Sequence, residues 1–173
     1  MRIYAGSVPL LVFLFIVNTA FLGCYSFRDV NLDPNVKTVR VQFIENRAPY
    51  QNPQVSPNLT DRLKQKIINQ TRLTQSNSEK VDWDISGEIR DYSVSTSGIS
   101  SNDGQSQTSI NRLTVTVHIV LLDNIKTETK EFDVTRQFDF DANQSLQTAE
   151  ARLLDEMIRN LTDEIFNRLF SDW

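Results

Sequence analysis

The chain has 173 residues, of which 39% are hydrophobic and 23% charged, and 22 acidic against 18 basic residues give a net charge of −4. This composition is typical of a globular domain, and it excludes a disordered tail, a collagen-like chain and a polytopic membrane protein. A single cysteine and a single histidine exclude an internal disulfide framework and argue against a multi-cysteine zinc site or a histidine-based catalytic cluster.

The first segment has the pattern of an export signal. Arg2 precedes an apolar stretch, Val8–Val17, that is shorter than the roughly 20 residues of a membrane-spanning helix. Phe21-Leu22-Gly23-Cys24 then resembles a bacterial lipobox. The sequence predicts removal of residues 1–23 and attachment of diacylglycerol and an N-acyl chain to Cys24, with no other cofactor. The alternative is an ordinary secretory leader followed by a chance cysteine.

The remainder is expected to be a tether and one domain. Residues 24–35 form the predicted lipidated tether, because two or more acyl chains anchor a protein stably in a membrane. Residues 36–173 form a single predicted α/β domain, and a mature chain of about 150 residues can bury a sufficient core without disulfides. Its acidic balance disfavours nucleic acid as a partner.

The first strand and the first helix follow the tether. Apolar and polar residues alternate over Val39–Phe43, which predicts a strand. A loop with three prolines comes next, and Ser56 is expected to cap a helix that has Pro57 in its first turn. Apolar residues recur every four positions over 59–67, so the helix should end near Thr71.

Three further alternating segments predict the rest of the sheet. They are Val81–Val94, Leu113–Leu121 and Phe132–Phe140. The Ser-, Gly- and Gln-rich stretch 95–108 is expected to be a long surface loop between two antiparallel strands. Arg136 falls on the apolar row of the last segment, which predicts either a bulge or a guanidinium that reaches the rim of the sheet.

A long amphipathic helix is expected from Ser145 or Thr148 nearly to the C-terminus. About 24 helical residues extend about 36 Å, enough to lie across a four-stranded sheet. The order β-α-β-β-β-α predicts an α+β fold, a two-layer sandwich of a four-stranded mixed sheet with both helices on one face.

The opposite face of this sheet is expected to be polar. One interpretation is a hydrated face, which is usual for antiparallel sheets, and the other is a face that docks in the water-filled lumen of a β-barrel. Its predicted members are Asp82, Asp84, Ser86, Glu88 and Arg90, then Arg112, Thr114, Thr116 and His118, and finally Glu131, Asp133, Thr135 and Gln137.

Catalysis is not expected. The pairs Asp82/Asp84 and Asp139/Asp141 could share a proton or bind a cation, but exposed strands produce the same spacing. His118 lies in mid-strand with no nucleophile-elbow sequence, so we expect it to be a cross-strand polar partner.

Several segments together resemble a known family. They are Cys24–Phe27, Val36–Phe43, Leu63–Leu73, Gly87–Tyr92, Asn111–Val115 and Asp163–Asn167. In their order, and together with the lipobox, they resemble the outer-membrane lipopolysaccharide-assembly lipoproteins, an LptE-like family, and in particular its Bacteroidota-type members.

The resemblance implies a function. Such proteins sit as a plug in a large outer-membrane β-barrel, help the barrel assemble and help insert lipopolysaccharide into the outer leaflet. A periplasm-facing protein anchored in the outer membrane through Cys24 is therefore expected. For lipopolysaccharide contact we select Arg90 and Arg112, which flank the predicted long loop and could bind phosphates bidentately. The alternative for both arginines is pairing with nearby carboxylates.

A second function from another class remains open at this point. An accessory or pilot lipoprotein of a secretin or a lipid exporter would have the same leader, a small α/β domain and no catalytic chemistry. Co-purification with a large barrel or with a secretin distinguishes the two.

Overall fold

The computed structural model describes residues 32–100 and 108–170. The predicted signal peptide, Cys24 and most of the tether lie outside the described residues. The described elements, in chain order, are β1 (Thr38–Val41), β2 (Glu45–Asn46), α2 (Val55–Gln70), β3 (Thr74–Gln75), β4 (Trp83–Ser100), β5 (Thr108–Asp123), β6 (Glu128–Asp141) and α3 (Leu146–Phe170).

The strands form one mixed sheet in the order β3-β1-β4-β5-β6, and β2 continues beside β4 after β1 ends. β1 and β2 run parallel to β4, whereas β4, β5 and β6 form an antiparallel meander. The predicted α+β fold and its four main strands are confirmed. The sequence did not predict β2 and β3, because two-residue strands have no measurable periodicity.

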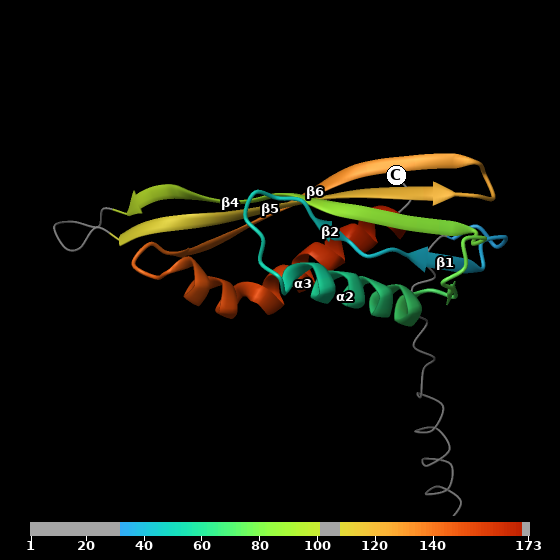
Figure 1. Ribbon diagram of the computed structural model, residues 1–173, viewed down its shortest axis with the longest axis horizontal. Coiled ribbons are helices and arrows are strands. Elements are labelled where there is room, and N and C mark those ends of the chain that lie inside the picture. The colour runs from blue at the N-terminus through green and yellow to red at the C-terminus, as the bar shows by residue number, and fades with distance from the viewer. Residues whose placement is uncertain (1–31, 101–107, 171–173) are drawn as a thin grey trace, which may run out of the picture.

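Both helices cover the same face of the sheet (Figure 1). They pack on each other, and the fully buried side chains between the layers include Leu59, Leu63 and Ile67 of α2 and Met157 and Leu161 of α3. Burying each of these side chains contributes about 1.5–3 kcal/mol relative to leaving it in water. The apolar rows of the sheet and the stripes of the helices therefore form one core.

The start of α2 differs from the prediction. The Asn52 side chain accepts a hydrogen bond from the backbone N–H of Gln54 at 3.0 Å, and the helix begins at Val55. Ser56 is already inside the helix and buried, and its hydroxyl has no partner among the described residues. The prediction of Ser56 as the cap is wrong, because the turn at Asn52 starts the helix before that residue.

The start of α3 agrees with the prediction. The Ser145 hydroxyl accepts the backbone N–H of Thr148 at 3.2 Å, and the Ser145 carbonyl accepts that of Ala149 at 3.0 Å. This is the pattern of an N-cap, in which a side chain satisfies a donor of the first turn.

The long loop is shorter than predicted. Residues 95–100 continue β4, and they pair with β5 as far as Ser100 opposite Thr108. The pairing of β4 with β5 shifts register after Ile89 and again after Thr96, and it continues through the polar residues of the hairpin. Residues 95–100 lack the alternating apolar row that predicts a strand, and only their backbone pairing with β5 extends β4 through them.

Arg136 reaches the rim of the sheet. The register of β5 with β6 is unbroken, and Arg136 lies opposite Val115 on the helix-facing row. Its guanidinium pairs with Glu164 of α3. Of the two predicted alternatives the rim position is therefore right, and a bulge is absent from the described pairing of these strands.

A buried polar cluster joins α3 to the sheet. The carboxylate of Glu150, 5% exposed, accepts hydrogen bonds from the hydroxyls of Tyr92 at 2.7 Å and Tyr50 at 3.2 Å. Burial, reinforced by the Glu150 carboxylate, raises the pKa of Tyr92, so this phenol stays protonated and donates. The cluster fixes the first turns of α3 beneath β4.

Neither described helix combines the length and the apolar character that a membrane crossing requires.

Candidate functional site

The face of the sheet opposite the helices, here called the outer face, is polar as predicted. Along β5, the helix-facing side chains of Leu113, Val115, Val117 and Ile119 are fully buried, while the alternate residues are partly exposed. No element among the described residues covers the outer face (Figure 1). Its members include Asp82, Asp84, Ser86, Glu88 and Arg90, then, after the register shift in β4, Asp91, Ser93 and Ser95, then Arg112, Thr114, Thr116 and His118, and then Glu131, Asp133, Thr135, Gln137 and Asp139.

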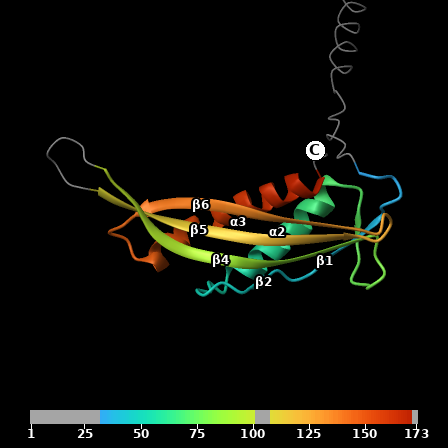
Figure 2. The same ribbon diagram turned by 90° about the horizontal axis from the view of Figure 1, so that it is seen from above.

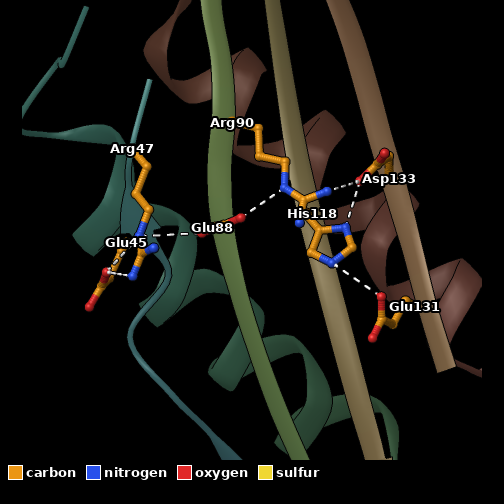
Figure 3. Close-up of polar contacts among 7 residues, drawn as sticks. All are labelled: Glu45, Arg47, Glu88, Arg90, His118, Glu131 and Asp133. Carbon is orange, nitrogen blue, oxygen red and sulfur yellow. Dashed lines mark hydrogen bonds and ion pairs between the residues drawn. The ribbon is translucent and has the colours of Figure 1, made fainter. Parts of the chain in front are cut away.

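His118 lies on β5, between strands β4 and β6 (Figure 3). Its Nδ1 is 2.7 Å from Oδ1 of Asp133, and its Nε2 is 3.8 Å from Oε2 of Glu131. The histidine side chain is only 12% exposed, because these two β6 side chains flank it. The prediction of a cross-strand polar partner is confirmed.

A row of acidic and basic side chains continues on the same face from this histidine across β4 to the chain around β2 (Figure 3). Glu88 accepts a hydrogen bond from Nε of Arg90 at 2.8 Å and pairs with Nε of Arg47 at 3.3 Å. Arg47 also binds Glu45, and Arg90 lies 3.7 Å from Asp133. The hydrogen bond from Arg90, followed by the charge of Arg47, lowers the pKa of Glu88. Four strands are thus linked across one face by polar and charged side chains.

Arg90 and Arg112, the two predicted lipopolysaccharide contacts, are not adjacent. Arg112 lies opposite Ser95 of β4, five positions along the strand from Arg90, which corresponds to about 16 Å. Arg112 binds Asp139 through Nε at 2.7 Å and Nη2 at 2.9 Å, and this contact lowers the pKa of Asp139. Each arginine therefore has a carboxylate partner, and a contact with glycolipid stays a prediction.

The carboxylates considered for acid–base chemistry have structural partners. One oxygen of Asp82 accepts the backbone N–H groups of Lys37 and Thr38, both at 2.8 Å, and these hydrogen bonds lower its pKa. Asp84 binds the guanidinium of Arg40, which lowers the pKa of Asp84 in the same way. Both carboxylates hold β1 against β4.

A shallow groove of about 440 Å³ crosses the outer face between the chain around β2 and strand β5. Phe43, which is 56% exposed, lies on one side, and Glu88, Arg90 and His118 are among the other lining residues. Within the described part of the chain, no three His, Cys, Asp or Glu side chains are placed to hold a metal ion. The groove is suited to polar contacts with another surface.

Phe43, Glu45 and Arg47 also belong to this face, and the sequence did not predict them there. Phe43 was assigned to the apolar row of the first strand, but β1 ends at Val41, and Ile44 is buried in its place. Arg47 lay in the predicted proline-rich loop. Only the pairing of β2 with β4 places these residues beside Glu88, and the sequence contained no signal for that pairing.

Comparison with known proteins identifies a family. The family model LptE, described as lipopolysaccharide-assembly, matches residues 36–169. No curated protein sequence matches the chain.

Several solved structures are similar to this chain. A neuraminyllactose-binding hemagglutinin homolog from Helicobacter pylori has 7% sequence identity and a TM-score of 0.55, with 83% of this chain and 87% of that chain covered. A minor lipoprotein from Acinetobacter baumannii has 12% identity and a TM-score of 0.43, with 78% and 87% covered. Uncharacterized lipoprotein B from Nitrosomonas europaea has 19% identity and a TM-score of 0.38, with 80% and 86% covered. At these identities the likeness to the first structure concerns the fold alone.

Proposed function

This chain belongs to the LptE family of lipopolysaccharide-assembly proteins, and from that premise we propose that it is an outer-membrane lipoprotein that acts as plug and assembly partner of the lipopolysaccharide-transport β-barrel. In this role it helps insert lipopolysaccharide into the outer leaflet and catalyses no reaction. Two acyl groups of diacylglycerol and one N-acyl chain on Cys24 anchor it to the membrane.

The main support from the structure is the outer face. The lumen of a large outer-membrane barrel is polar and filled with water, so a plug must present polar groups to it. The outer face does so with side chains that already have partners, such as His118 with Asp133 and Arg112 with Asp139. Contact with the lumen then leaves few charges unpaired, and bridging water satisfies the remaining groups.

The position at which the chain enters the domain supports an orientation of the domain relative to the membrane. Asp33 lies 3.8 Å from Lys126 in the β5–β6 turn, so the chain enters the domain at that end of the sheet. The 16 residues of β5 place the far end of the β4–β5 hairpin about 50 Å away (Figure 1). With Cys24 eight residues before Leu32, the acyl chains hold the first end near the inner leaflet and the hairpin extends away from the anchor.

We assign lipopolysaccharide contact to Arg90 and Arg112. Both guanidinium groups are partly exposed, at 47% and 37% of the side chain. A lipid phosphate would compete with Glu88 at the first and with Asp139 at the second, and a guanidinium fork can bind a phosphate bidentately.

Co-purification tests the proposed function. The full-length tagged protein is expressed in its native envelope and extracted in mild detergent, and proteins recovered in near-equal amount are identified by mass spectrometry. We expect one large lipopolysaccharide-assembly barrel. Recovery of a ring-forming secretin or a lipid exporter instead would assign the protein to another envelope machine, and recovery of no partner would contradict the plug.

A further inference from the structure

Strand β6 is the last strand of the sheet, and one of its edges is free. It pairs with β5 in an unbroken register from Asp141 opposite Ile110 to Glu128 opposite Asp123. On its other side no strand among the described residues pairs with it. Alternate backbone N–H and C=O groups of a strand at this position point away from the sheet, where another extended chain can bind them.

Helix α3 forms a shelf beneath this edge. Seen from above, α3 crosses diagonally under the sheet, and its C-terminal half extends beyond β6 (Figure 2). A groove of about 790 Å³ lies between the two elements, lined by Thr135, Arg136 and Gln137 of β6 and by Asn160 and Asp163 of α3. The Arg136 guanidinium is paired with Glu164 of α3. A single extended segment can lie in such a groove and pair with the strand, as in other domains that add a peptide to a sheet edge.

The charges on the outward row of β6 indicate what kind of segment fits. This row contains four carboxylates and no lysine or arginine, and the carboxylates of Glu131 and Asp133 remain 60% and 54% exposed. Opposite charges on directly facing residues of neighbouring strands stabilise the pair, and like charges destabilise it. The row, in order, is Thr129, Glu131, Asp133, Thr135, Gln137, Asp139 and Asp141.

A second copy of this chain offers no complementary charge at the edge, because the outward row of β6 contains no lysine or arginine. Antiparallel pairing of two β6 strands centred on Thr135 places Glu131 of one copy opposite Asp139 of the other, and this repulsion occurs twice.

We propose that the free edge of β6, above the shelf of α3, binds an extended segment of the barrel partner as an additional strand. The segment carries lysine or arginine at one or two alternate positions, which face Glu131 and Asp133. This inference rests on the proposed function, since the barrel is the partner, and it specifies where on this chain the barrel is held.

Cross-linking in the native envelope tests the proposal. A photoreactive benzoylphenylalanine replaces Thr129, Thr135 or Gln137 in the full-length chain, and Gln65 on the exposed side of α2 is the control position. We expect all three edge positions to attach to one segment of the barrel. Because paired strands have the same rise per residue, the attachment sites for positions 129 and 135 should be six residues apart, and those for positions 135 and 137 two residues apart, each to within one residue. Attachment to scattered segments, to a second copy or to this chain's own tether would overturn the proposal.

A charge-reversal variant provides a second test of the strand pairing. We expect Glu131→Lys to lower the amount of barrel recovered about fivefold and Glu131→Gln to lower it less, because the first places like charges opposite each other. Asp155→Lys on α3 makes the same charge change elsewhere and should leave recovery unchanged. Full recovery with Glu131→Lys would overturn the strand pairing while leaving the proposed function intact. Absence of a barrel from the wild-type sample would refute both.

Discussion

The imidazole Nδ1 of His118 lies 2.7 Å from Oδ1 of Asp133, directly across the ladder between β5 and β6. The contact joins the only histidine of the chain to a carboxylate, a pair that in sequence alone could suggest acid–base chemistry. In the structure it is one of several cross-strand pairs on the outer face. The same is true of Arg112 with Asp139 and of Thr116 with Thr135. These pairs organise a polar surface.

Removing the Asp82 carboxylate should loosen β1. Asp82→Ala leaves the backbone N–H groups of Lys37 and Thr38 without their acceptor, and we expect a loss of about 1–2 kcal/mol in the free energy of unfolding. Urea unfolding of the soluble domain measures this loss. The exposed Asp61→Ala on α2 is the control, and equal stability of both variants would contradict the anchoring role.

The domain should lose stability in acid. The pKa values of Asp82, Asp84, Glu88 and Asp139 are lowered by their partners, so each carboxylate binds protons less readily in the folded chain than in the unfolded one. Their contribution is therefore complete above the ordinary carboxylate pKa of about 4 and is lost as the pH falls through the lower folded values.

The pH dependence of urea unfolding between about pH 7 and pH 3 checks this expectation. Asp84→Asn cannot ionise and should flatten the acid side of the profile relative to the wild type. A wild-type profile that is flat from about pH 5 to pH 3 would show that the carboxylate contacts do not stabilise the fold.

Removing a single hydroxyl from the buried cluster around Glu150 should destabilise the fold. Tyr92→Phe removes the 2.7 Å hydrogen bond to a buried carboxylate, and we expect a loss of about 1–3 kcal/mol in the free energy of unfolding. Tyr50 is 41% exposed and donates at 3.2 Å, so Tyr50→Phe should cost less. The reverse order in thermal or urea unfolding would contradict the arrangement.

The proposed glycolipid contact is tested at the two outer-face arginines. We expect Arg90→Glu combined with Arg112→Glu to weaken binding of purified lipopolysaccharide at least about tenfold, since two phosphate contacts become repulsive. Arg62→Glu on the exposed side of α2 makes the same kind of charge change as a control, and circular dichroism checks the fold. Unchanged binding by the folded double variant would remove these residues from the assignment.

Much of the fold was predictable from periodicity. Apolar and polar residues alternate regularly along β5, because this strand is paired on both sides and has one buried and one polar face. The buried residues are Leu113, Val115, Val117 and Ile119, and the polar ones are Arg112, Thr114, Thr116 and His118. The start of α3 was also predictable, because Ser145 precedes an amphipathic stretch and caps it.

The errors occurred where tertiary contacts decide the local structure. Ser56 resembles a cap in sequence, but the turn at Asn52 starts the helix earlier. Phe43 continues the alternation of β1 in sequence, but the strand ends before it and exposes the ring. The positions of Glu45 and Arg47 on the outer face depend on a two-residue strand, and no local pattern encodes it.

Depletion of the protein in its native envelope tests its role as plug and assembly partner. The amount of folded transport barrel is followed by its heat-modifiable migration, and surface lipopolysaccharide is followed by labelling of intact cells. We expect both to fall together and the full-length chain to restore them. Unchanged amounts of folded barrel and surface lipopolysaccharide after depletion would contradict the role of plug and assembly partner.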